Sequence, residues 1–148
     1  MWRPVAGEGV VVREIDADYA RLFFGDERIV VVETKEGVVV EGVMVKRALE
    51  LIERHLGAGF VAIIDRRHHY KLMRLEIYGE VNACDSLLGL AIVTHSTAAD
   101  MLTDLEIPLS RKPIAKFRSL EDAMDWARAL IGCCTQPQCA VALSAGES

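Results

Sequence analysis

Residues 66–71, "RRHHYK", concentrate side chains that can take part in binding or catalysis. The segment follows the apolar stretch "FVAIID" and holds three basic residues, two histidines and a tyrosine. Guanidinium groups bind carboxylates and phosphates through charge-assisted hydrogen bonds, and neutral imidazoles are good metal ligands. The segment is therefore either a catalytic or metal-binding loop, or only the polar turn that ends a buried strand.

Two further polar segments follow the later strands expected from the sequence. In an open α/β sheet, loops and helix N-termini converge outside the carboxyl ends of parallel strands. We therefore expect three segments to meet at one edge of the sheet and to suit an anion or an acidic peptide. The candidate ligand- or partner-binding residues are Asp65, Arg66, Arg67, His68, His69, Tyr70, Thr94, His95, Ser96, Arg118 and Ser119.

Two other interpretations of this cluster stay open. In the plainer one, Asp65 caps a helix, the arginines are solvated and the histidines are ordinary polar loop residues. In the sharper one, a small enzyme or metal protein uses His68, His69, His95 and Asp65 as its cluster. Adjacent residues of an extended loop point in opposite directions, so "HH" is a poorer ligand pair than H-x-H in a strand. No cofactor is predicted.

Motifs for other chemistries are absent. The sequence has no G-x-S-x-G elbow, no G-x-x-x-x-G-K-S loop and no G-x-G-x-x-G fingerprint. We interpret the isolated Cys84 as a small core residue rather than a nucleophile. The other three cysteines lie in "GCCTQPQC", which lacks zinc-knuckle spacing and a nearby histidine. The sequence therefore leans toward a non-enzymatic protein.

Apolar patterns predict the strands that position the candidate site. Residues 9–16 have strand composition, and a turn at "GDER" joins two further strands, "YARLFF" and "IVVVET". The continuous apolar runs "FVAII" and "LGLAIVT" are typical of parallel strands covered on both faces. "PIAKF" is the last short strand.

Helical periodicity predicts four helices between and after these strands. Residues 41–56 form the first, which ends at Gly57, and a weaker pattern follows at Leu72, Leu75, Tyr78 and Val81. Ser96 caps a third helix at about residues 97–105, and Ser119 caps a fourth that ends at Gly132. The inward faces expected for these two helices are Ala98, Met101, Leu102 and Leu105, and Leu120, Ala123, Met124, Ala127, Leu130 and Ile131.

These elements predict an α/β fold with a mixed sheet of about five to six strands and about four helices. The N-terminal strands are antiparallel, and the later ones are parallel and joined by right-handed crossovers. A chain of 148 residues with 51% hydrophobic content fits one globular domain. We assign residues 1–132 to that domain and expect residues 133–148 to form a flexible C-terminal tail.

Charge and hydropathy exclude some partners and locations. The net charge is −5 with both signs mixed along the chain, so nucleic acid is not expected as a partner. The longest apolar runs are far below the ~20 residues of a membrane span. The N-terminal residues lack the apolar core of a signal peptide, so we expect a cytoplasmic protein with free thiols.

The order of elements resembles the STAS-like fold of bacterial anti-sigma-factor antagonists, and more closely an uncharacterised SpoIIAA-like branch. The resemblance runs from about Tyr19 to Ile131. It rests on "IVVVETKEGVVVEGVMVKRALELI", "IIDRRHHY", "LAIVTHS" and "IAKFRSLEDAMDWA", none of which is a catalytic motif. The resemblance implies a regulatory or binding module without naming its partner.

The same resemblance raises the question of a phosphorylation switch. In the anti-sigma antagonists, phosphorylation falls on a serine that opens the helix after the central strand. Here the corresponding stretch has no serine or threonine before Ser86, and Lys71 stands where similar sequences often carry a serine. A kinase-driven switch at that position is therefore not expected, although the fold assignment is unaffected.

The favoured function is a STAS-like module that binds a protein partner or a small ligand, anions included, at the carboxyl edge of the parallel strands. The last helix offers a second surface, because Trp126 lies outside its apolar stripe and an exposed tryptophan favours a partner or dimer face. A homodimer is left open. The alternative is the small enzyme or metal-binding protein described above.

Overall fold

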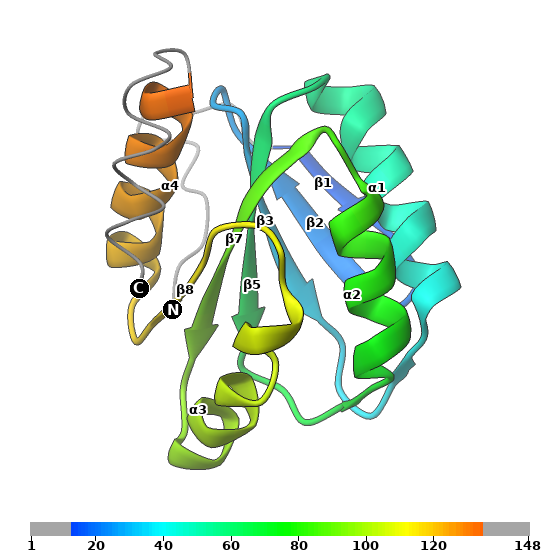
Figure 1. The fold of residues 1–148 in the computed structure, drawn as a ribbon. Helices are drawn as coiled ribbons and strands as arrows, with labels where there is room; N and C mark the ends of the chain where they lie inside the picture. The colour runs from blue at the N-terminus through cyan, green and yellow to red at the C-terminus, as the bar shows by residue number, and fades with distance from the viewer. Residues whose placement is uncertain (1–12, 135–148) are drawn as a thin grey trace.

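A six-stranded mixed sheet forms the centre of the computed structural model, which describes residues 13–134 (Figure 1). In spatial order its strands are β1 (Arg13–Asp16), β2 (Ala20–Phe24), β3 (Ile29–Thr34), β5 (Phe60–Arg66), β7 (Leu87–Thr94) and β8 (Ile114–Phe117). The pairings β1 to β2 and β2 to β3 are antiparallel, and those from β3 through β8 are parallel. The mixed sheet predicted from the sequence is confirmed.

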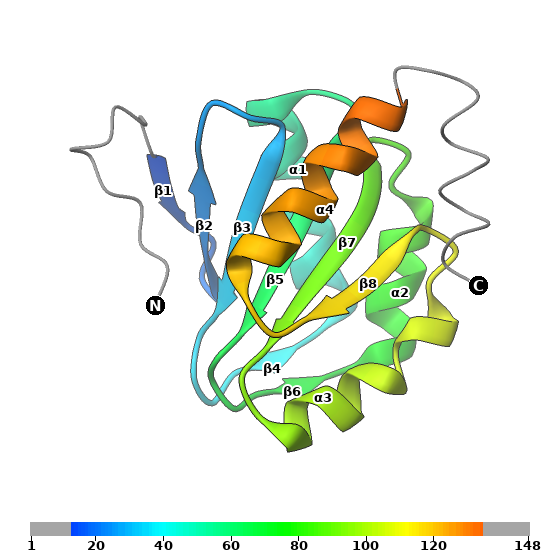
Figure 2. The ribbon, with the colours of Figure 1, turned by 90° about the vertical axis from the view of Figure 1, so that its left-hand side faces the viewer.

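Helices cover both faces of this sheet. They are α1 (Gly42–Leu56), α2 (Arg74–Ala83), α3 (Thr97–Asp104) and α4 (Leu120–Cys134), with a short 3-10 helix η2 (Ile107–Leu109) after α3. Figures 1 and 2 show α1 and α2 on one face and α4 on the other, while α3 lies at the end of the sheet. No helix within residues 13–134 has the length and apolar character needed to cross a membrane.

Two apolar cores lie on the two faces of the sheet. One packs α1 and α2 against the sheet, and the other packs α4 against it. Strands β5 and β7 contribute to both, since alternate residues of a strand point to opposite faces. The continuous apolar runs that predicted doubly covered strands are confirmed.

The first helix follows its predicted pattern closely. Its buried positions include Ala48, Leu49 and Ile52. Gly57 ends the helix with a positive φ of 75°, and its N–H donates to the carbonyl of Glu53 at 2.7 Å. A left-handed conformation is readily adopted by glycine, so the residue after Leu56 decides where the helix stops.

The last helix confirms its apolar stripe but not its predicted end. Ala127 is fully buried between α4 and the sheet, and the Ser119 hydroxyl accepts the N–H of Asp122 at 3.1 Å. The helix continues past Gly132 to Cys134, because Gly132 lacks the positive φ of a helix-ending glycine. The expected flexibility of the tail beyond Cys134 concerns residues outside the described range.

Trp126 does not form an exposed partner face. Its side chain is half-buried and packs on the core beneath α4, with its ring centroid 6.0 Å from that of Phe117. The helix lies close to the last parallel strand, so a residue beside the stripe also meets the sheet. A partner surface based on an exposed Trp126 is therefore wrong.

The patterns predicted for the middle helices are wrong in part. Leu72 belongs to a separate two-residue strand, β6 (Lys71–Leu72), which pairs in parallel with β4 (Val39–Val40). In α2, Tyr78 and Val81 are buried, but Leu75 is 79% exposed. Its side chain lies away from the sheet, although its spacing from Tyr78 fits one helical face.

The predicted inward face of α3 points outward. Met101, Leu102 and Leu105 are exposed, and the buried residue of this helix is Thr103. Because α3 caps the end of the sheet instead of covering a face, it meets polar groups rather than an apolar layer (Figure 1). Ala98, the fourth residue of that face, is exposed as well.

Replacing Gly89 with alanine is expected to destabilise the fold. An added Cβ would lie 2.6 Å from Cδ2 of Leu130 and 2.8 Å from the carbonyl oxygen of Pro113. Overpacking of this kind costs about 1–3 kcal/mol, measurable by urea unfolding. Gly79→Ala in α2 is the control, because its Cβ meets nothing within 4 Å and the change should leave stability equal or higher. Equal stability of the two variants would contradict the close approach of α4.

Candidate functional site

A cleft of about 160 Å³ lies at the carboxyl edge of the parallel strands, between the segment after β5 and the first turns of α3. From the predicted site it gathers residues 66–70 together with His95 and Ser96. Thr94 faces Arg66 in the parallel register of β5 and β7, which brings the two segments side by side. The convergence of these two segments, expected from strand direction, is therefore present.

The loop after β5 is anchored on its other side by the turn after β3. The backbone N–H of His69 donates to Oε2 of Glu36 at 3.0 Å, and the carbonyl of His69 accepts the N–H of Gly37 at 2.8 Å. The short ladder of β4 and β6 then carries the chain into α2. The loop is thus held by the Glu36 side chain and by neighbouring backbone, and it is not a free polar turn.

The remaining predicted residues lie outside the cleft. Thr94 is buried, and its hydroxyl donates to Oδ1 of Asp100 at 3.2 Å. Arg118 lies 3.5 Å from the same carboxylate, and Ser119 caps α4. Neither Arg118 nor Ser119 lines the cleft, so the third segment does not join the other two.

Arg66 is a buried ion-pair partner rather than a solvated arginine. Its two terminal nitrogens each lie 2.5 Å from an oxygen of Glu106, and one also donates to Thr103 at 3.0 Å. The Tyr78 hydroxyl donates to Glu106 at 2.9 Å. Burial raises the pKa of Tyr78, with the charge of Glu106 adding to the effect, so the phenol keeps its proton.

The Arg66 guanidinium stays charged although it is buried. Burial by itself lowers the pKa of the Arg66 guanidinium, but the hydrogen bond with Glu106 and the surrounding groups raise it overall. The pair joins β5 to the segment after α3. The attachment of α3 at this point is polar.

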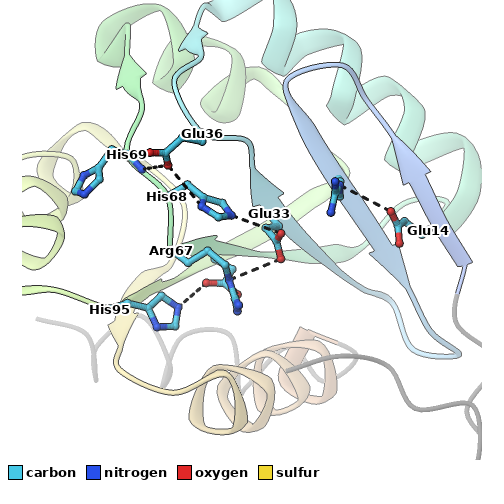
Figure 3. Close-up of polar contacts among 9 residues, drawn as sticks. Glu14, Glu33, Glu36, Arg67, His68, His69 and His95 are labelled. Carbon is cyan, nitrogen blue, oxygen red and sulfur yellow. Dashed lines mark hydrogen bonds and ion pairs between the residues drawn. The ribbon is translucent and has the colours of Figure 1, made fainter. Parts of the chain in front are cut away.

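Asp65 and Arg67 form a second network beneath the cleft. Asp65 lies within β5 and does not cap a helix, and it accepts hydrogen bonds from both Nε and a terminal nitrogen of Arg67. Arg67 also approaches Glu33 at 3.7 Å. Nε2 of His95 lies 2.6 Å from Oδ1 of Asp65, and its ring reaches that carboxylate from the loop after β7 (Figure 3). The plainer interpretation is therefore wrong for both arginines and for Asp65.

The histidines do not converge on a common point. His68 lies between Glu33 and Glu36, at 3.8 and 3.5 Å, and Figure 3 shows the ring of His69 pointing away from it. His95 is directed at Asp65 instead. Within the part of the chain that the structure describes, no three His, Cys, Asp or Glu side chains are placed to hold a metal ion. The geometry does not favour the metal-binding alternative.

Arg74, which sequence reasoning missed, also lines the cleft. Its Nε is buried without a hydrogen-bond partner, and Arg74 forms no ion pair with any residue in the range 13–134. It is the first residue of α2, where basic residues are not favoured by the helix dipole. Apart from that unfavourable position, the sequence carries no signal that distinguishes it from other surface arginines.

An apolar cavity of about 70 Å³ lies behind the cleft, between the sheet and helices α1 and α2. The two spaces share Arg66, Tyr70, Leu72 and Glu106 as walls. The Tyr70 hydroxyl is buried, and burial raises its pKa. A few shared residues, among them Arg66 and Glu106, therefore separate the cleft from the apolar space behind it.

Fold and cleft together define a mixed α/β protein with a basic and histidine-rich cleft where its parallel strands end. No protein-family model matches the chain, and no curated protein matches it. A solved structure similar to it is an uncharacterised protein from the DUF3478 family, from Shewanella loihica PV-4, with a SpoIIAA-like fold. Sequence identity is 12%, the match covers 80% of this chain and 93% of that chain, and the TM-score is 0.46.

Proposed function

We propose that this chain is a non-enzymatic binding module whose cleft takes a small organic anion. The observation that carries the proposal is the buried, unpartnered Nε of Arg74 in the cleft wall. A buried donor without a partner costs free energy, and a carboxylate or phosphate oxygen would satisfy it. The α3 N-terminus supplies further donors, since Ser96 lines the same cleft.

Arg74 suits the ligand better than the arginines predicted from the sequence. Arg66 and Arg67 already bind Glu106 and Asp65, so their charges are largely compensated within the protein. A ligand that competed for them would leave a buried carboxylate unpaired, which is costly. Arg74 has no such internal partner among residues 13–134.

The apolar walls indicate what the rest of the ligand is made of. Leu72 and Leu102 line the cleft, and Leu72 is shared with the apolar cavity behind it. Small-molecule sites typically combine an apolar lining with a few polar groups that orient the ligand. We therefore expect an anion that carries a short aliphatic portion rather than a bare inorganic ion.

Calorimetric titration with hexanoate and hexyl phosphate tests this function. Both probes are expected to bind more tightly than inorganic phosphate or hexanol, because only they combine a charge with an apolar chain. Arg74→Gln should weaken their binding about tenfold or more, the loss expected for one hydrogen bond to a charged group.

The matched control is Arg54→Gln, which removes the same charge from an exposed position on α1. It should leave the affinity for both probes unchanged. Equal weakening by the two substitutions would assign the effect to net charge and contradict a site at Arg74. If neither hexanoate nor hexyl phosphate bound to the protein, the result would contradict the proposed function.

An acidic peptide from a protein partner is the second candidate, favoured by the exposed apolar face of α3. Met101 and Leu105 lie on that face outside the cleft, whereas Leu102 lines the cleft itself. Met101→Ser with Leu105→Ser should therefore weaken binding of a peptide of glutamates and leucines but not of hexanoate. An unchanged peptide affinity would contradict this second candidate.

A further inference from the structure

His95 and Asp65 form an oriented pair at the cleft that ligand binding alone does not require. Nε2 of His95 lies 2.6 Å from Oδ1 of Asp65, while the other carboxylate oxygen is held by Arg67. The Asp65 side chain is 2% exposed, and that of His95 is 41% exposed. The carboxylate is thus fixed inside the protein, and the imidazole that it holds reaches solvent.

This contact decides which nitrogen of a neutral His95 is free. An ionised carboxylate only accepts hydrogen bonds, so Nε2 carries the proton and Nδ1 keeps its lone pair. A carboxylate in this position also orients the ring and stabilises the positive charge that develops when the free nitrogen reacts. His95 therefore has the arrangement of an activated nitrogen nucleophile.

The surroundings of His95 suit a phosphoryl group. His95 precedes Ser96, the N-cap of α3, and the Ser96 hydroxyl accepts the N–H of Ala99 at 3.1 Å. The backbone N–H groups of Thr97 and Ala98 precede the first intrahelical bond and are available to an anion. Independently of the helix, Arg74 lines the same cleft, and its Nε is buried without a hydrogen-bond partner.

We propose that His95 is a phosphoryl acceptor. The Nδ1 lone pair forms a nitrogen–phosphorus bond, and the bond between phosphorus and the leaving group of the donor breaks. The donor class is a small activated phosphate, such as an acyl phosphate or phosphoramidate, and the bonding electrons leave with the carboxylate or amine. The ring gains a positive charge that Asp65 stabilises through the Nε2 proton, so no other reactant is needed.

The proposal goes beyond the binding function, because it names a covalent modification of the chain. It rests on the proposed function only in that the cleft must admit an anion. The titrations described above measure that property without any reaction at His95. Failure of binding and failure of modification are therefore separate results.

The test is reaction of the full chain with phosphoramidate at neutral pH, followed by mass spectrometry and peptide mapping without acid. His69 is the internal control, because it is exposed on the loop after β5, lines the same cleft, and has a ring with no carboxylate partner in Figure 3. We expect the rate of reaction at His95 to be at least about tenfold higher than at His69. A positioned catalytic group typically contributes about a hundredfold or more, so this expected ratio is a modest one. In His95→Gln the fast-reacting site should disappear while the rate at His69 stays unchanged.

Asp65→Asn tests the positioning role of the carboxylate. The ratio of His95 to His69 rates should fall toward one in the folded variant, which a merely structural role would not cause. Because Asp65 is buried and this variant can fail to fold, the wild-type ratio is also compared between native protein and protein in urea. A native ratio near one, a ratio that urea leaves unchanged, or a folded Asp65→Asn variant with the wild-type ratio would each overturn the proposal.

Discussion

Ala127→Asp is expected to abolish the folded state at room temperature. Ala127 has no exposed surface, and it lies in the apolar core that α4 forms with the sheet. The substitution would bury a carboxylate with no counter-charge among the residues of that core. The cost is several kcal/mol, comparable with the whole stability of about 5–15 kcal/mol that a domain has. Circular dichroism and urea unfolding measure it.

Ala129→Asp, two positions along the same helix, is the matched control. Ala129 is exposed, so the same change of side chain there should alter the free energy of unfolding by no more than about 0.5 kcal/mol. Comparison of the two variants separates burial from any effect on helix propensity or net charge. A soluble Ala127→Asp protein with native-like unfolding would mean that α4 is not packed as described.

Glu106→Ala is expected to lower the free energy of unfolding by about 3–5 kcal/mol. Glu106 is fully buried and accepts hydrogen bonds from both Arg66 and Tyr78. Its removal leaves a buried guanidinium whose charge has no counter-ion nearby, and that penalty exceeds the loss of the contacts themselves. Urea unfolding monitored by fluorescence gives the change directly.

Two further variants assign that effect to the unpaired charge. Arg66→Met combined with Glu106→Leu removes both charges and should recover much of the stability, because apolar residues of similar volume can replace a buried ion pair. Glu27→Ala breaks an exposed pair with Arg128 and should cost less than about 1 kcal/mol. If Glu106→Ala lowered the free energy of unfolding by less than about 1 kcal/mol, the result would contradict a buried ion pair between Arg66 and Glu106.

Local sequence patterns were sufficient for most of the elements that build the sheet. Two kinds of pattern were informative: the apolar runs that form β5 and β7, and the periodic apolar stripes of α1 and α4. Each of these patterns lies within a single strand or helix. They reflect burial against a large apolar surface, which these elements do meet. Glycine predicted the end of one helix but not of the other. Gly57 adopts a positive φ and ends α1, whereas Gly132 continues α4.

Strand direction also made part of the site predictable. Parallel neighbours end at the same edge, so the residues after β5 and β7 had to lie near one another. Arg118 and Ser119 also follow a parallel strand, but they turn toward Asp100 and α4. A position just after a parallel strand is therefore not sufficient to place a residue in the cleft.

What the sequence by itself determined was the type and order of the elements and the edge at which polar residues collect. Only the tertiary structure decided the partners of those residues, because Glu33, Glu36 and Glu106 come from segments far from residues 65–70 in the chain. It also decided that α3 exposes its apolar face and that Arg74 faces the cleft. Pairing of charges across such separations depends on distances of a few ångströms, which only the packed chain defines.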